Sequence, residues 1–144
     1  MYRTRLVLVA LATISSMGVA LAVASPAQAD TKWSECRAGG DILTGWTEFD
    51  FGTQNTIYVH RAGFNIERNG GTHNNVYLKL RGNEGESTYW SWISEDDIVG
   101  GRSYERKKIN TRVPRGAKPI MKYHATFDQR GADPSCAAYG HLGW

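Results

Sequence analysis

The chain has 144 residues, of which 41% are hydrophobic and 22% are charged, and it contains only 2 cysteines and 4 prolines. These values exclude a disordered chain, a collagen-like chain and a disulfide-dense miniprotein. The sequence alone does not define one activity, but it predicts a cellular location, a fold class and a short list of candidate binding surfaces.

The first 29 residues are organised like a Sec-type secretory signal peptide. Arg3 and Arg5 form a basic start, apolar runs follow, and residues 27–29 read Ala-Gln-Ala, the small-x-small pattern that signal peptidase recognises. We expect cleavage before Asp30 and a secreted, extracellular protein. The alternative is an uncleaved transmembrane anchor, but polar residues interrupt the apolar run, and a span needs about 20 mainly apolar residues.

Residues 30–144 are expected to form a single domain, because the 115 residues left after cleavage are enough to bury one core. This part carries 15 basic and 14 acidic side chains, so its net charge is close to zero. A nearly neutral domain argues against a nucleic-acid partner. We expect a monomer without transmembrane anchoring.

Apolar residues recur along this domain with a period of two, and glycine and asparagine interrupt them at short intervals, as in antiparallel strands joined by turns. In residues 46–51, for example, Trp46, Glu48 and Asp50 alternate with Thr47, Phe49 and Phe51. The predicted strands, in chain order, are residues 46–51, 56–67 with a bend or bulge after Gly63, 76–81, 87–93, 102–110 as an edge, and 120–127.

Six or seven short antiparallel strands without intervening helices predict an all-β fold, a small β-sandwich with a small β-barrel as the alternative. The apolar side chains expected to fill its two core layers are Phe49, Phe51, Val76, Leu78, Leu80, Met121, Tyr123 and Phe127.

Both cysteines, Cys36 and Cys136, lie near the ends of the predicted domain. Export would place them in an oxidising compartment, where such a pair forms a disulfide. The alternative is a reactive or metal-binding thiol, although no second cysteine or histidine accompanies either residue at a metal-ligand spacing.

The predicted domain is rich in aromatic residues, which number 15. Trp90 and Trp92 share one face of a predicted strand, about 7 Å apart, with Tyr89 beside them. Such a ladder could stack on sugar rings or anchor a protein partner, so we predict it as the ligand-binding site. The alternative is that both tryptophans point into the core and Tyr89 points outward.

Basic residues gather in the second half of the chain. They predict a basic strip able to meet an anionic polymer or lipid surface, unless they form a solvated edge. The strip comprises Arg102, Arg106, Lys107, Lys108, Arg112 and Arg115, continuing to Lys118 and Lys122. Its Pro-containing segment, residues 113–116, could also be an exposed inhibitory loop that offers Arg112 or Arg115 to a trypsin-like protease.

No motif of an enzyme is present, so we predict no catalytic residues and no cofactor. The acidic loops leave calcium as a weak possibility, with Asp96, Asp97, Asp128 and Asp133 as the oxygen ligands. No histidine spacing predicts another metal site.

These observations together predict a secreted, non-enzymatic binding protein that recognises an extracellular carbohydrate or cell-wall polymer. The alternative is a secreted proteinaceous inhibitor or antagonistic toxin acting on a protein or membrane, and an enzyme ranks third.

Overall fold

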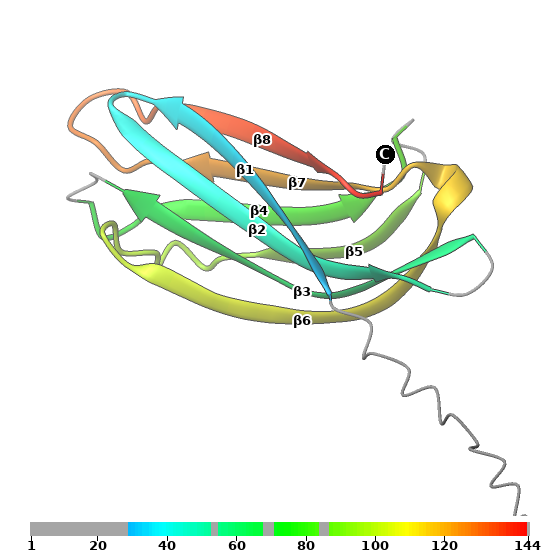
Figure 1. The fold of residues 1–144 in the computed structure, drawn as a ribbon. Helices are drawn as coiled ribbons and strands as arrows, with labels where there is room; N and C mark the ends of the chain where they lie inside the picture. Colours follow the sequence, from blue (N-terminus) through cyan, green and yellow to red (C-terminus); the bar gives the residue numbers. More distant parts are fainter. Residues whose placement is uncertain (1–28, 53–54, 68–70, 84–86, 144) are drawn as a thin grey trace, which may run out of the picture.

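The computed structural model describes residues 29–52, 55–67, 71–83 and 87–143 (Figure 1). The predicted signal peptide therefore lies, apart from Ala29, outside the described residues. The described chain forms eight strands and one short 3-10 helix. Their bounds are β1 Asp30–Ala38, β2 Asp41–Phe51, β3 Thr56–Glu67, β4 Asn75–Arg81, β5 Thr88–Ile93, β6 Ser103–Pro114, η1 Arg115–Ala117, β7 Ile120–Thr126 and β8 Ser135–His141.

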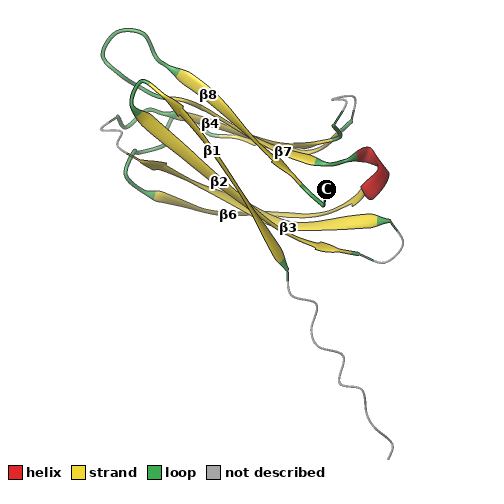
Figure 2. Ribbon diagram, turned by 45° about the horizontal axis from the view of Figure 1, so that its top comes forward, coloured by secondary structure: helices red, strands yellow, loops and turns green. Residues whose placement is uncertain are grey.

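The strands form two four-stranded antiparallel sheets that face each other (Figure 1 and Figure 2). The first sheet has the order β1-β2-β3-β6 and the second has the order β5-β4-β7-β8. This arrangement confirms the predicted sandwich over the barrel. The strands number eight rather than six or seven because β1 and β8 were not expected from the sequence.

The core lies between the sheets and is filled by alternate residues of the central strands. Leu43, Phe49 and Phe64 face inward from the first sheet, and Leu78 and Tyr123 from the second. Phe51 was predicted in this core, but it is 48% exposed because it ends β2 at the rim of the sandwich. The other seven predicted core residues are buried.

Tyr123 is the largest fully buried side chain of the core, and its hydroxyl is hydrogen-bonded to the Thr47 hydroxyl on the facing sheet. Burial raises the pKa of Tyr123, because a phenolate would lose its hydration there. Space for the ring comes from Gly45, where an added Cβ would approach the Tyr123 ring within 2.3 Å.

The predicted disulfide is confirmed. Cys36 on β1 and Cys136 on β8, 100 residues apart, are bonded with their Cα atoms 5.8 Å from each other. β1 is an edge of the first sheet and β8 an edge of the second. The bridge therefore closes one side of the sandwich covalently.

Candidate ligand-binding platform

The predicted ladder of Trp90 and Trp92 does not form an exposed surface. On β5 these residues pair with Leu80 and Leu78 of β4 and share their inward face. The Trp92 ring centroid lies 5.9 Å from that of Phe64, and both tryptophans pack against the core. The alternative interpretation, in which both rings point inward, describes the structure.

Tyr89 lies at an irregularity of the β4–β5 pairing, between the partners of Leu80 and Arg81. It is partly buried against the core and borders a hollow of about 180 Å³ with Gly82 and Ala117 among its lining residues. The three residues predicted to bind a ligand together therefore do not form one platform.

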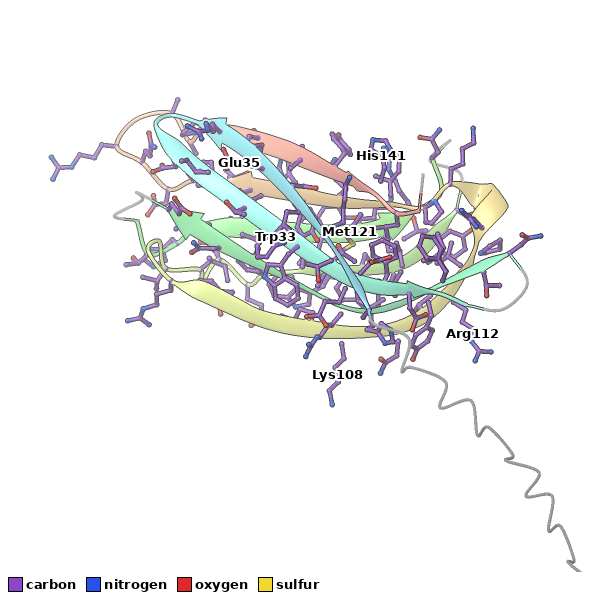
Figure 3. All side chains as sticks on the ribbon, viewed as in Figure 1. Trp33, Glu35, Lys108, Arg112, Met121 and His141 are labelled. Carbon is purple, nitrogen blue, oxygen red and sulfur yellow. A yellow bond between two sulfur atoms is a disulfide. The ribbon has the colours of Figure 1, made fainter. Side chains whose placement is uncertain are left out.

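The basic strip is not continuous in space, because β6 turns successive side chains to opposite faces of its sheet. Lys108 and Arg112 project outward from the first sheet (Figure 3). Lys107 instead has its ammonium nitrogen 4.4 Å from the Trp92 ring centroid. Arg102 is exposed just before β6, and the side chain of Arg106 lies outside the described residues.

The segment predicted as an exposed inhibitory loop comprises the end of β6 and η1, and its exposed residues are Arg112, Pro114, Arg115 and Gly116. Val113 is fully buried, and the Arg115 amide donates a 2.6 Å hydrogen bond to the carbonyl oxygen of Asn55. The Arg115 guanidinium lies 5.0 Å from the Phe51 ring centroid. Pairing with β3 and these contacts hold the segment against the body of the protein.

The four carboxylates considered as calcium ligands are not gathered into a site. Asp96 accepts a 2.8 Å hydrogen bond from the Asn75 amide, and Asp133 accepts one of 3.3 Å from the backbone of Gln129. Within the described ranges, no three His, Cys, Asp or Glu side chains are grouped as metal ligands.

An aromatic pair with one exposed and one half-buried ring lies elsewhere, on the outward face of the first sheet. Trp33 of β1 and Trp46 of β2 are direct cross-strand partners, with ring centroids 6.4 Å apart and planes inclined by 52°. Trp33 is 61% exposed. We call this pair, together with Gly63 beneath Trp46, the tryptophan platform. Trp33 is labelled in Figure 3.

Gly63 on β3 allows the Trp46 indole to lie flat against the sheet. It is the cross-strand partner of Trp46, and a Cβ at this position would lie 2.1 Å from an indole carbon. The ring therefore occupies the space that any other side chain would fill.

Charged side chains continue the platform across the sheet. Glu48 forms an ion pair with Arg61, and Asp50 Oδ2 lies 2.9 Å from His60 Nε2. The edge of the Tyr58 ring meets the His60 ring at a centroid distance of 4.6 Å. Charge-assisted hydrogen bonds of this kind fix side chains in place while leaving some of their donors and acceptors at the surface.

A β-bulge explains why two successive residues, His60 and Arg61, both reach this outward face. The pairing of β2 with β3 shifts between Glu48 and Phe49, so that Arg61 pairs with Glu48 while Val59 pairs with Phe49. The extra residue is His60. A bulge was predicted in this strand after Gly63, and the pairing with β6 does shift around Gly63, between Ala62 and Phe64. The bulge against β2 lies three residues earlier. Bulges characteristically redirect side chains in this way.

Two adjoining hollows mark the surface. One, of about 260 Å³, is lined by Thr31, Trp33, Trp46 and Glu48. The second, of about 340 Å³, is lined by Glu48, His60, Arg61, Lys108 and Asn110, and also by Ala29, which the predicted cleavage before Asp30 would remove. Because Glu48 borders both, an extended ligand can contact the aromatic pair and the charged groups together.

The sequence reasoning missed the tryptophan platform, although it contained one signal. Trp46 alternates with the inward residues Thr47 and Phe49 and so shares a face with Glu48 and Asp50. A tryptophan on the charged face of a strand is a candidate surface residue. Nothing comparable identified Trp33.

No protein-family model matches the chain, and neither a curated protein nor a solved structure is detectably similar to it. Among the residues that the structure describes, none belongs to a helix of the length and apolar character required to cross a membrane.

Proposed function

We propose that the protein is a secreted, non-enzymatic binding protein that recognises an extracellular carbohydrate or cell-wall polymer through the tryptophan platform. The observation that carries this proposal is the Trp33–Trp46 pair, because large aromatic side chains usually lie buried. The disulfide is compatible with an oxidising extracellular compartment.

Two inclined indoles suit a sugar chain better than a flat apolar partner. Each indole offers a flat apolar face to the C–H groups on one side of a sugar ring. The inclination of 52° between them would let successive, mutually twisted sugars contact one indole each. Aromatic groups held in a defined orientation also favour binding of a specific ligand over non-specific hydrophobic association.

The adjacent charged groups supply the hydrogen bonds that a sugar requires. A hydroxyl group both donates and accepts, so it can donate to the Glu48 carboxylate and accept from the Arg61 guanidinium. Because these two side chains already form an ion pair, their positions are set before a ligand arrives. Such preorganisation lowers the entropic cost of binding.

The test is retention of residues 30–144, which contain all eight strands, on insoluble peptidoglycan, chitin and cellulose. Trp33→Ala should weaken retention by about tenfold or more, as expected for an aromatic hot spot. Trp33→Phe keeps a ring and should recover part of it. Ile93→Ala is the matched control, because Ile93 is 65% exposed on the other sheet, and it should bind normally.

Equal retention of the Trp33→Ala variant and the unaltered protein would show that the platform is not the site. Failure of the unaltered protein to bind any of the three polymers would contradict the carbohydrate proposal and favour the inhibitor or toxin alternative. Retention that persists at high salt is expected, because stacking is only weakly screened.

A further inference from the structure

The outward face of the second sheet carries a different chemistry from the tryptophan platform. Strands β4, β5, β7 and β8 contain no aspartate or glutamate. Their outward positions include Lys79 and Arg81 on β4, Lys122 on β7 and Tyr139 on β8. We call these four residues the basic face.

The positive charges of the basic face are forced close together by strand pairing. Lys79 and Lys122 are direct cross-strand partners, an arrangement that places Cβ atoms about 5 Å apart and is unfavourable for like charges. Arg81 lies two residues along β4 from Lys79 and therefore on the same side. The sheet thus places three cationic side chains next to one another on neighbouring strands.

These cations have no carboxylate partner within the described part of the chain. None of the three forms an ion pair there, and the buried Nε atom of Arg81 has no hydrogen-bond partner. The nearest contact of Arg81 is aromatic, with its guanidinium 5.9 Å from the Tyr139 ring centroid. No described carboxylate therefore offsets the repulsion between Lys79 and Lys122, and an anionic ligand would do so.

We propose that the basic face is a second binding site, which takes an anionic polysaccharide. Its cations repeat at about 5 Å across the strands and about 7 Å along β4, so several anionic groups on one chain can each meet a cation. Tyr139, which is 45% exposed and is the β8 partner of Lys122, gives the intervening sugar a ring and a hydroxyl.

A polymer fits this surface better than an anionic membrane. Peripheral membrane binding combines basic residues with apolar side chains that enter the lipid. On the second sheet, the large hydrophobic residues exposed among those described are Tyr139 and Ile93. Ile93 pairs with Tyr77 of β4, one row from Lys79, and it is the single exposed large aliphatic side chain among the described residues, so the charges are accompanied by one such side chain rather than by a row.

The test compares two double variants that lose the same charge at different places. Lys79→Gln with Lys122→Gln removes two cations from the basic face, and Arg112→Gln with Arg115→Gln removes two exposed cations from the end of β6 and from η1. The probes are a sulfated polysaccharide, polygalacturonate and neutral dextran. We expect the first double variant to bind both anionic probes about tenfold more weakly at moderate salt, and the second to remain within about twofold of the unaltered protein.

The first double variant should fold, because it removes a like-charge pair, and an unchanged or raised melting temperature would verify this. If both double variants lost the same affinity for the anionic probes, the effect would depend only on net charge, and the proposal would be overturned. Binding to phosphatidylglycerol vesicles but to neither anionic polysaccharide would also overturn it, in favour of a membrane.

This inference does not depend on the proposed function. Trp33→Ala should leave binding to the anionic probes unchanged, and the Lys79 and Lys122 substitutions should leave retention on neutral cellulose unchanged. Each proposed site is therefore tested by a different variant, and one proposal can fail while the other holds.

Discussion

The two outward faces of the sandwich differ in how their charges are compensated. On the first sheet, three carboxylates near the tryptophan platform have basic side chains as partners: Glu35 with Arg37 at 2.7 Å, Glu48 with Arg61, and Asp50 with the His60 imidazole. On the second sheet, the cations of the basic face have none among the described residues. The charges near the tryptophan platform are thus paired within the protein, whereas no described carboxylate pairs with those of the basic face.

The difference shows where the fold constrains the sequence and where it does not. Both inward faces must be apolar and closely packed, because together they form one core. The outward faces contribute little to that core, so their side chains can be specialised separately. Each of the following predictions tests whether the two faces are independent.

The largest effect is expected from removing the disulfide that joins the two sheets. Cys36→Ser with Cys136→Ser opens a loop of 100 residues and should lower the free energy of unfolding by about 4 kcal/mol, measured by urea denaturation. Both cysteines lie on the inward side, packed against the core. The variant, where still folded, should keep both binding activities, and their joint loss would show that the faces depend on each other.

Substitutions at two glycines of the first sheet test the core and the surface separately. Gly45 faces the core, and Gly63 faces the outward side. Gly45→Ala forces a Cβ into the buried Tyr123 ring and should destabilise the fold by about 3 kcal/mol through overpacking. Gly63→Ala meets only the Trp46 indole, which can lift from the sheet, so its stability cost should be about 1 kcal/mol or less.

The binding result should be the reverse of the stability result. Gly63→Ala should weaken retention on the responsive polysaccharide, because it displaces Trp46, and should leave binding to anionic polysaccharides unchanged. If Gly63→Ala instead destabilised the fold as much as Gly45→Ala, the platform would belong to the core.

The smallest effect concerns His124, which lies on the outward side of β7 beside the basic face. Burial, and then the charge of Lys122, lower the pKa of His124. Below the usual histidine pKa of about 6.5, the unfolded chain binds a proton that the folded chain does not. Stability is therefore lost as the pH falls from 6.5 through the lower folded-state pKa.

His124→Gln should flatten this part of the pH dependence, measured as the urea midpoint between about pH 7.5 and 5. His73→Gln, which removes an exposed loop imidazole, is the matched control. A bound anionic polysaccharide should also reduce the slope, because it opposes the charge of Lys122. An identical pH profile for the unaltered protein and the His124→Gln variant would contradict the assignment.

The fold was largely predictable because the central strands alternate clearly between apolar and polar residues. In β4, Val76, Leu78 and Leu80 face the core, as expected. The two strands missed are the edge strands β1 and β8. Most of β1 is exposed, and β8 is rich in small residues, so neither has a strong apolar period.

The candidate sites were less predictable, because tryptophan and lysine do not reveal which side of a strand faces water. Trp92 shares the inward face of its β4 partner Leu78, whereas Trp46 shares the outward face of its β3 partner Gly63, which leaves room for the indole. Such partners are distant in sequence. The pairing of Lys79 with Lys122 likewise depends on strand order, which one sequence does not give.

The position of the disulfide has a mechanical consequence for a protein held by a polymer on each face. Trp33 lies three residues from Cys36 on β1, and Tyr139 lies three residues from Cys136 on β8. Tension between the two polymers would therefore pass from one ligand-bearing strand to the other through a short covalent path. Force applied at Trp33 and Tyr139 would bypass the hydrogen-bonded interior strands, whereas force applied at Trp46, Lys79 or Lys122 would still load β2, β4 or β7.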